Sequence, residues 1–412
     1  MSAPPANRSR VIVVGAGPAG AALAFLLARR GIEVVLLERH TDFAREFRGE
    51  VLLPGGLEAV DQMGLWDAFD RIDHVKLEAL ELYVNRKRRL RTSFVPDGFG
   101  RYAPRWVSQP ALLEMLVEKA AAFPAFRLER GAAVRALVHE GGRCVGVRVL
   151  AAAGERELRA DLVVGCDGRS SMVRRRAGLP EAQDPVPMDV VWCKLPLPAY
   201  AIHDKPLRGY VGGGHLLLAA PVYGGLLQIA WLIRKGAFGE LRERGMPACL
   251  EEMAKHVSPD LAGHLRRHAR DAVQPFLLST VSDRALEWSR PGLLVIGDAA
   301  HTMSPVGAQG LNIALRDALV AANRLVPVLL ARGGAAEIDA AARAVQDERV
   351  PEVSEIQRIQ AVPPRVLFRD AWWTRLLLRI VPLLLGSELA RGRRALLVRR
   401  FLFGVTEVRL SV

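Results

Sequence analysis

The sequence predicts an α/β protein in which a domain built on a parallel sheet is interleaved with a mostly antiparallel sheet and followed by C-terminal helices. Two observations predict this fold. Residues 10–38 read as strand, glycine-rich turn, helix and strand, the order of a parallel βαβ unit. Residues 181–285 read as short strand-like runs separated by turn glycines, which indicates antiparallel pairing. A chain of 412 residues is long enough for both units.

The βαβ unit opens with a β-branched run, Arg10 to Val14, which is typical of a buried parallel strand. The segment GAGPAG follows at once, and the helix-forming run AALAFLLARRG closes on Gly31. Ile32 to Leu37 is the second expected strand, and Glu38 ends it. The unit is therefore a Rossmann-type dinucleotide fingerprint in its full context.

Each glycine of this turn has a physical task. Gly15 permits the tight turn, Gly17 lets the backbone approach a pyrophosphate, and Gly20 lets helix and strand pack closely. The helix N-terminus attracts phosphates, and Glu38 can accept hydrogen bonds from a ribose diol. The alternative is an ordinary glycine-rich turn. The predicted dinucleotide contacts here are Gly15, Gly17, Ala19, Gly20, Glu38 and Arg39.

Two later segments narrow the choice of dinucleotide. Asp161 to Gly165 reads as a strand that leads to Asp167, the aspartate of a DG pair. Gly292 to Ile296 reads as another strand, closed by Asp298 in a GD pair, and a proline- and glycine-rich loop then leads to a helix. Ligands of open α/β sheets bind at the carboxyl ends of the strands, where both aspartates are expected.

Together the three segments resemble the class A, single-component FAD-dependent monooxygenases, the aromatic hydroxylases of the para-hydroxybenzoate hydroxylase type, over roughly residues 10–330. The resemblance implies that the βαβ unit binds the ADP half of FAD. It places Asp167 near both FAD and the nicotinamide cofactor, Asp298 on the ribityl chain, and the helix that follows near the isoalloxazine. The flavin contacts it implies are Arg48, Gln109, Asp167, Asp298, Pro305, Gly307, Gly310, Leu311 and Asn312.

The resemblance also implies the reaction. NAD(P)H reduces FAD, O2 adds as a C4a-hydroperoxyflavin, and one oxygen atom passes to an electron-rich aromatic or hydrophobic small molecule, which is hydroxylated or epoxidised. No side chain must act as a nucleophile, so no catalytic residue is predicted. The alternative is an FAD-dependent reductase or dehydrogenase of a prenyl or lipid-like substrate.

Other chemistries are less well supported. Ser170 and Ser171 lie in no GxSxG turn, which argues against a hydrolase. Lys76 raises the possibility of a flavin halogenase, but the WxWxIP segment of those enzymes is missing near Trp231. His301 is expected to pack or hydrogen-bond rather than react. Nine histidines and four cysteines show no HExxH or CxxC grouping, so neither a metal site nor a disulfide scaffold is expected, and a cytoplasmic location fits.

The motifs divide the chain into three parts. The FAD-binding domain is expected to be discontinuous, and the substrate domain to fill the gaps. The predicted FAD-binding domain comprises residues 1–75, 106–180 and 286–350, the substrate domain 76–105 and 181–285, and a basic amphipathic helical region 351–412. Trp192, Tyr210, Tyr223 and Trp231 of the substrate domain are expected either to line the pocket or to form its core.

The C-terminal region carries much of the positive charge. The net charge is +13, and residues 364–412 hold ten arginines against three acids. The arginines alternate with Leu, Ile and Trp, which disfavours nucleic-acid binding and favours a lipid or protein surface. We expect Phe368 to Phe403 to dock on an anionic membrane surface or on the FAD-binding domain, with helix breaks at Pro363–Pro364 and Pro382.

Overall fold

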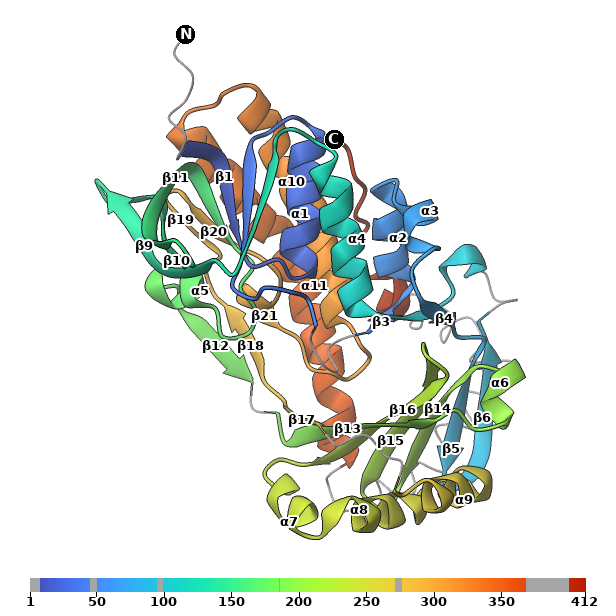
Figure 1. The fold of residues 1–412 in the computed structure, drawn as a ribbon. Coiled ribbons are helices and arrows are strands. Elements are labelled where there is room, and N and C mark those ends of the chain that lie inside the picture. The colour runs from blue at the N-terminus through green and yellow to red at the C-terminus, as the bar shows by residue number, and fades with distance from the viewer. Residues whose placement is uncertain (1–7, 45–49, 95–98, 185, 271–275, 368–399) are drawn as a thin grey trace.

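The computed structural model describes every residue except 1–7, 45–49, 95–98, 185, 271–275 and 368–399. A large mixed sheet with helices packed on it forms the upper part of the molecule in Figure 1, and a second large sheet forms the lower part. The first described strand and the C-terminus both lie on the upper part.

The upper sheet is parallel at its centre. Its strands are β1 (Arg8–Val14), β2 (Val34–Glu38), β8 (Phe126–Arg130), β9 (Ala133–Glu140), β10 (Arg143–Ala151), β11 (Gly154–Gly165), β19 (Ser289–Arg290) and β20 (Leu293–Val295). The order is β19-β20-β11-β1-β2-β8, and β20, β11, β1, β2 and β8 run parallel. β10 and β9 continue antiparallel from β11. The three strands predicted to precede the motifs are therefore confirmed.

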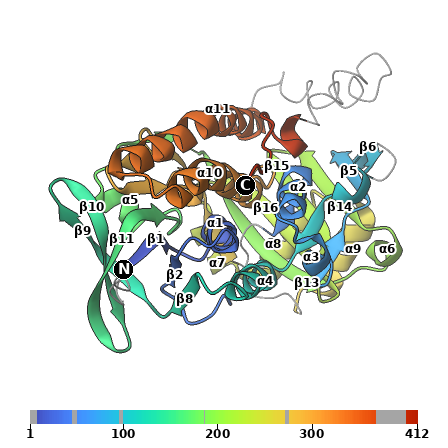
Figure 2. The same cartoon turned by 90° about the horizontal axis from the view of Figure 1, so that it is seen from above.

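Helices pack on this sheet and on one another. They are α1 (Pro18–Arg29), α2 (Pro54–Gln62), α3 (Trp66–Phe69), α4 (Gln109–Ala121), α5 (Met172–Arg176), α10 (Gly310–Leu330) and α11 (Ala335–Leu367). α1 packs against α4 and α10, and α11 packs along α10 (Figure 2). Residues 19–28 of α1 are all buried, which explains why its sequence is apolar on every side.

The lower sheet is almost entirely antiparallel. Its strands are β5 (Ala79–Val84), β6 (Lys87–Ser93), β13 (Met188–Pro196), β14 (Pro206–Gly212), β15 (His215–Val222), β16 (Leu226–Arg234) and β17 (Phe276–Ser279). They lie in the order β17-β13-β16-β15-β14-β5-β6, and β14 and β5 pair in parallel. Strands from residues 79–93 and 188–279 thus share one sheet, and the predicted domain boundaries stay a prediction.

The outer face of this sheet is covered by helices. Short helices α6 (Tyr200–His203), α7 (Phe238–Glu243), α8 (Gly245–Ala254) and α9 (Pro259–Arg267) belong to this part of the chain. Side chains of α8 and α9 form one apolar core with Val191, Cys193 and Leu195, alternate residues of β13. Because side chains alternate along a strand, Val190, Trp192 and Lys194 lie on the opposite face, toward the FAD-binding motifs.

Small elements connect the two parts. They are β3 (Val51–Leu52), β4 (His74–Lys76), β7 (Arg105–Val107), β12 (Glu181–Asp184), β18 (Ser282–Ala285) and β21 (His301–Thr302), with the 3-10 turns η1 (Gly100–Tyr102) and η2 (Gly297–Ala299). They form two three-stranded sheets, β3-β7-β4 and β12-β18-β21. In the second of these, β12 follows α5, and β21 comes directly after the turn of Asp298.

The expected helix break at Pro363–Pro364 is wrong. α11 continues through both prolines to Leu367, and it also contains Pro351. A proline removes one backbone hydrogen bond, but its fixed φ is compatible with a helix, so a long helix packed on a neighbour can retain it. Pro382 lies outside the described residues.

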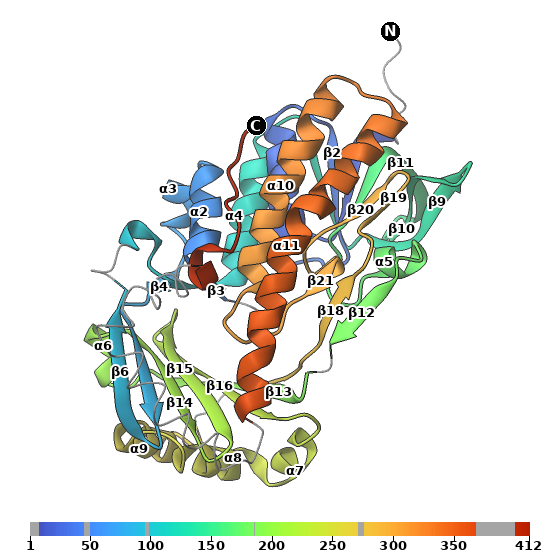
Figure 3. The same ribbon diagram turned by 180° about the vertical axis from the view of Figure 1, so that it is seen from behind.

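Residues 400–412 pack on the FAD-binding side of the molecule (Figure 3). The amide of Gln62 on α2 donates to the carbonyl of Val408 at 3.0 Å and accepts the N–H of Leu410 at 2.6 Å. Asn323 on α10 binds the backbone of the same segment. Residues 368–399, which carry most of the predicted membrane-docking region, lie outside the described residues. Among the helices that are described, none is long and apolar enough to span a bilayer.

A buried charge network ties α10, α11 and residues 405–406 together. Asp317 accepts hydrogen bonds from His301 Nε2 and Arg349 Nε, each at 2.7 Å. Arg349 also pairs with Glu352, and Glu352 pairs with Arg316 at 2.9 Å. These side chains are at most 3% exposed. Breaking such a pair leaves a charge buried without its partner.

We therefore expect Glu352→Gln to destabilise the protein by about 3–5 kcal/mol, the usual cost of breaking a buried ion pair. Glu251→Gln is the matched control, because Glu251 forms a half-exposed, bidentate pair with Arg266. The control should change the free energy of unfolding by no more than about 1 kcal/mol. Urea denaturation of both variants measures this, and equal effects would contradict a structural role for the network.

The same network predicts a loss of stability in acid. Burial opposes ionisation of Asp317, but His301 and Arg349 outweigh it and lower the pKa of Asp317 to about 2. Because this folded-state pKa lies below the value of about 3.9 in an unfolded chain, Asp317 stabilises the fold above that pH, and the contribution disappears as pH falls toward 2. Urea denaturation at several pH values between 5 and about 2 should show the free energy of unfolding falling as the pH falls. In Asp317→Asn the free energy of unfolding should depend less steeply on pH. An unchanged pH dependence would show that Asp317 does not cause this loss of stability.

Candidate active site

A cavity of about 2930 Å³ lies between the βαβ unit and the inner face of the seven-stranded sheet. A pocket for one drug-sized ligand measures roughly 300–1,000 Å³, so this one has room for a large cofactor and a substrate. Predicted site residues that line it are Gly15, Gly17, Ala19, Glu38, Arg39, Gln109, Asp167, Asp298, Pro305, Gly307, Gly310 and Leu311. Gly20 and Asn312 are not among the lining residues, and Arg48 lies outside the described part of the chain.

The glycines of the first turn differ in what requires them. A Cβ on Gly15, whose φ is +99°, would lie 2.5 Å from the carbonyl oxygen of Cys166. A Cβ on Gly20 would lie 2.0 Å from the carbonyl oxygen of Gly15. A Cβ on Gly17 would meet protein no closer than 4.0 Å and would enter the cavity instead. Gly15 and Gly20 therefore allow the turn to pack, while Gly17 leaves space for a ligand.

The N-terminus of α1 faces that space. Gly17 is the N-cap residue, no side chain caps the helix, and the first intrahelical bond runs from Ala21 N–H to Gly17 O. The amides of Ala19 and Gly20 thus have no acceptor within the helix. Free amides and the helix dipole suit a pyrophosphate, so this part of the cavity fits the ADP half of FAD.

Glu38 lies at the end of β2, beside this helix. Its carboxylate accepts the backbone N–H of Ala16 and that of His40, each at 3.0 Å, and the side chain is 3% exposed. Arg39 follows it at the rim of the cavity, with its Nε 3.0 Å from His40 Nε2. The hydrogen bonds from Ala16 and His40 fix the Glu38 carboxylate at the edge of the cavity, where a ribose hydroxyl can reach it.

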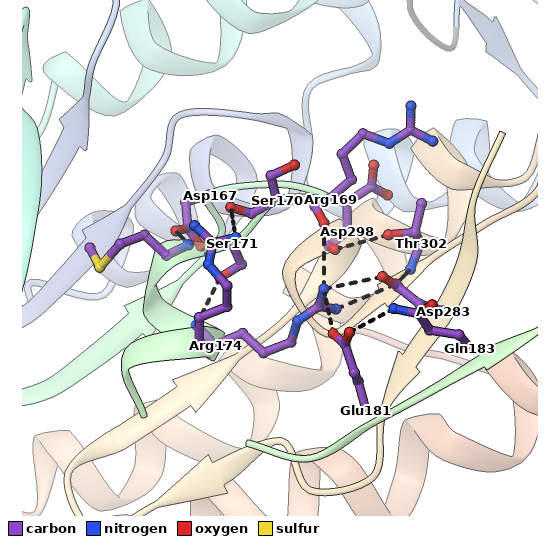
Figure 4. A network of polar contacts seen from close by, with 12 residues as sticks. Asp167, Arg169, Ser170, Ser171, Arg174, Glu181, Gln183, Asp283, Asp298 and Thr302 are labelled. Atoms are coloured by element: carbon purple, nitrogen blue, oxygen red, sulfur yellow. Dashed lines mark hydrogen bonds and ion pairs between the residues drawn. The ribbon is translucent and has the colours of Figure 1, made fainter. Parts of the chain in front are cut away.

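Asp167 holds its own loop together (Figure 4). Its carboxylate accepts the hydroxyl of Ser171 at 2.5 Å and the backbone N–H groups of Met172 and Val173 at 2.7 and 3.1 Å. The side chain therefore caps the start of α5, and Gly168 continues the turn with a φ of +81°. The carboxylate of Asp167 therefore shapes the loop at the wall of the cavity, and its predicted place near FAD and the nicotinamide stays a prediction.

A buried ion pair joins the two aspartate motifs, as Figure 4 shows. Arg174 on α5 donates to Asp283 on β18 at 3.1 Å, and both side chains are about 5% exposed or less. Asp283 also accepts the backbone N–H of Thr302 at 3.1 Å. The hydroxyl of Thr302 lies 3.5 Å from the carbonyl oxygen of Asp298. The loop of Asp167 and that of Asp298 are thus held at a fixed relative position.

Asp298 lies on η2 with its side chain exposed to the cavity, next to the N-terminus of α10. A Cβ on Gly310, the first residue of α10, would lie 3.9 Å from the Asp298 carboxylate. α10 has no side-chain cap, so its first amides are free to bind an anionic ligand group. A carboxylate beside a helix N-terminus fits a ribityl chain followed by a flavin ring.

The side chain of Asn312 is hydrogen-bonded within the protein, and its predicted contact with the flavin stays a prediction. Its side-chain amide accepts the N–H of Leu53 at 2.8 Å and donates to the carbonyls of Val51 and Ala308 at 3.2 and 2.7 Å. It therefore ties α10 to β3 and the start of α2. Gln109 is confirmed as the first residue of α4, and it lines the cavity.

The substrate end of the cavity is mainly apolar. The inner face of the seven-stranded sheet contributes Leu80, Leu82, Val190, Trp192, Leu207, Leu216, Leu218, Gln228, Ala230, Leu232, Phe276 and Leu278. Of the four aromatic residues considered above, Trp192 lines the cavity, whereas Tyr210 and Trp231 lie in the core beneath α8 and α9. Tyr223 donates from its hydroxyl to Glu50 at 2.5 Å.

The sequence did not single out several residues of the cavity wall. Glu50 is 5% exposed, lines the cavity, and also accepts the indole N–H of Trp106 at 3.1 Å. Phe401 and Phe403 reach the wall from far along the chain, and Phe403 stacks on Phe99 with ring centroids 5.9 Å apart. No local pattern indicates such contacts, because they depend on the tertiary fold.

His301 is fully buried and hydrogen-bonded to Asp317, so the expectation of a packing histidine is confirmed. Among the described residues, three possible metal ligands meet outside the cavity: His215, Glu252 and His256. The two imidazole rings stack 3.8 Å apart, and His215 lies 3.2 Å from the indole nitrogen of Trp231. Burial and the neighbouring His256 lower the pKa of His215 to about 4. The expectation of no metal site stays a prediction.

Comparison with known proteins agrees with this geometry. Residues 8–351 match the family model described as FAD binding domain. A 6-methylpretetramide 4-monooxygenase from Streptomyces rimosus is 34% identical over 371 residues, which cover 88% of this chain and 86% of that protein. Squalene epoxidase 1 from Arabidopsis thaliana is 29% identical over 343 residues, or 77% of this chain and 59% of that protein.

The fold recurs in solved structures. The p-nitrophenol 4-monooxygenase from Pseudomonas putida DLL-E4 superposes with a TM-score of 0.81 at 19% identity, covering 97% of this chain and 100% of that one. The predicted fold class and monooxygenase activity are confirmed, and the reductase alternative is not favoured. The chain belongs to the FAD-binding-domain family and is an FAD-dependent monooxygenase.

Proposed function

We propose that this chain uses NAD(P)H and O2 to hydroxylate a large aromatic molecule in the cavity between the βαβ unit and the seven-stranded sheet. The observation that carries the proposal is the continuity of this cavity. One end offers Gly17, Glu38 and Asp298 to a dinucleotide, and the other offers an apolar wall of strands. Bound FAD and substrate can therefore contact each other inside one cavity.

The chain's own residues position and protect the reactants. The N-terminus of α1 and Glu38 hold the ADP half of FAD, while Asp298 and the N-terminus of α10 hold its ribityl and ring end. Bound FAD supplies electron transfer from NAD(P)H and activation of O2. The leucines of the sheet exclude water from the place of reaction, which favours oxygen transfer to substrate over loss as peroxide.

The size and apolarity of the wall favour a substrate of several fused rings. The 34% identical relative is named for 6-methylpretetramide, and we propose a substrate of that kind here. A second candidate reaction is epoxidation of a hydrophobic alkene, which the similarity to squalene epoxidase 1 and the apolar wall favour. Docking of residues 368–403 on an anionic membrane, with the chain at the inner membrane surface, would suit either substrate and stays a prediction.

The first expectation concerns FAD. The purified protein should be yellow and should release FAD on denaturation, whereas Gly17→Val should lower the FAD content by roughly tenfold or more, because the side chain enters the pyrophosphate space. The control is Gly239→Val on α7, where an added Cβ meets nothing within 4 Å. Absorbance at the flavin bands measures both. Full FAD content in Gly17→Val would show that the site is misplaced.

The second expectation concerns oxygen. With an aromatic substrate, NAD(P)H and 18O2, one labelled oxygen atom should appear in the product, as mass spectrometry can detect. Asp298→Ala should weaken FAD retention, because it removes the exposed carboxylate beside α10. A saturated product with all label in peroxide or water would contradict oxygenation and favour the reductase. An epoxide formed from an alkene, with aromatics untouched, would favour the second candidate.

A further inference from the structure

The apolar wall of the cavity contains two buried polar atoms that lack partners. Gln228 is 3% exposed, and its Oε1 accepts no hydrogen bond from any described residue. The indole Nε1 of Trp192 is also buried, and no described residue accepts its hydrogen. Both residues line the cavity. Leaving a buried polar atom unpaired costs about 1–3 kcal/mol, so a pair of such atoms in a binding wall calls for a ligand.

Strand register places these two side chains close together. On β13 and β16, Trp192 lies opposite Ala230, and Lys194 lies opposite Gln228. Trp192 and Gln228 are therefore diagonal neighbours on one face of the sheet, with Cα atoms about 7–8 Å apart, so both side chains can reach one ligand group. Lys194 is directed elsewhere, with its Nζ 4.0 Å from Glu50 and above the ring of Tyr223.

Around this pair the wall is hydrocarbon. The flanking side chains on the same face are Ala230, Leu218, Leu232 and Phe276. An aromatic ring system can lie against them, with one polar substituent directed between the indole and the amide. The polar pair then selects the orientation of the ring, because every other position would leave both atoms unpaired.

We propose that Trp192 and Gln228 bind one hydroxyl group of the aromatic substrate, the indole N–H donating to its oxygen and Gln228 Oε1 accepting its hydrogen. An indole nitrogen only donates, and an amide oxygen only accepts, so the group that satisfies both must do both. A phenolic hydroxyl does so, whereas an ether or a ketone satisfies Trp192 alone. This inference rests on the proposed function and extends it to a substrate class, the hydroxylated polycyclic aromatics.

The test uses the FAD-loaded enzyme and three probes of nearly equal size: 1-naphthol, 1-methoxynaphthalene and naphthalene. Their dissociation constants follow from the perturbation of the flavin absorbance. The wild type should bind 1-naphthol about threefold to tenfold more tightly than 1-methoxynaphthalene, the range for one neutral hydrogen bond. It should bind 1-methoxynaphthalene more tightly than naphthalene by a similar factor.

Two variants separate the contributions. Gln228→Leu should abolish the preference for 1-naphthol over 1-methoxynaphthalene, because it removes the acceptor. Trp192→Phe should instead reduce the advantage of both oxygenated probes over naphthalene. Trp231→Phe is the matched control, since it deletes an indole N–H on the opposite face of the same sheet, where His215 already binds it. The control should leave all three ratios unchanged.

The outcomes are distinguishable from those of the proposed function. If the wild type binds the probes equally or not at all, or if Gln228→Leu retains the preference, the hydroxyl site is wrong, and water rather than substrate pairs these atoms. The oxygen-labelling experiment is unaffected by that result. Flavin content and melting temperature of each variant are measured alongside, so a folding defect cannot imitate a change in the ratio of two dissociation constants.

Discussion

The arrangement of the cavity depends most on the hydrogen bonds and ion pairs of the buried Asp317 carboxylate. This carboxylate lies in α10, and it accepts the backbone N–H of Gly297 at 2.9 Å, directly before the aspartate that faces the cavity. It also receives His301 and Arg349, and through Arg349 and Glu352 it is connected to the amides of Val405 and Thr406. Elements separated by a hundred residues thus meet at one buried set of charges.

Because these charges are buried, each needs its partners, and the network acts as a unit. The consequence for the cofactor site is rigidity. The N-terminus of α10 and the turn η2 are fixed to each other at Asp317, and the Asp167 loop is fixed to the same region by the pair Arg174–Asp283. Groups that bind a cofactor gain precision when their supports are held this way.

The polar residues of the motifs therefore divide by task. Glu38, Asp167 and Asp298 line the cavity, where a cofactor can reach them, and Asp167 also caps a helix, whereas Asn312 links α10 to β3. A sequence motif indicates which residue type occupies a position. It does not indicate whether the side chain itself contacts the ligand or only holds the backbone that does.

This division explains how much the sequence could predict. The βαβ unit, the strands before Asp167 and Asp298, and the family follow from local patterns of glycine and apolar residues, because short-range geometry determines them. Gln228 could not be found in this way, since its position beside Trp192 follows from the register of two strands. Phe401 is likewise brought to Gly307 by tertiary packing, which no neighbouring residue reveals.

The strand order has a consequence for how the chain folds. β1 pairs on one side with β2, which follows it closely in sequence, and on the other with β11 at residues 154–165. β11 pairs in turn with β20 at residues 293–295. Parallel pairing between strands far apart in sequence slows folding, because a long loop must close before the strands can pair. During synthesis the glycine turn is made early, yet its sheet is complete only after strands β13 to β17 of the antiparallel sheet have been translated. FAD therefore has no complete site to bind until β20 and the turn of Asp298 have been translated.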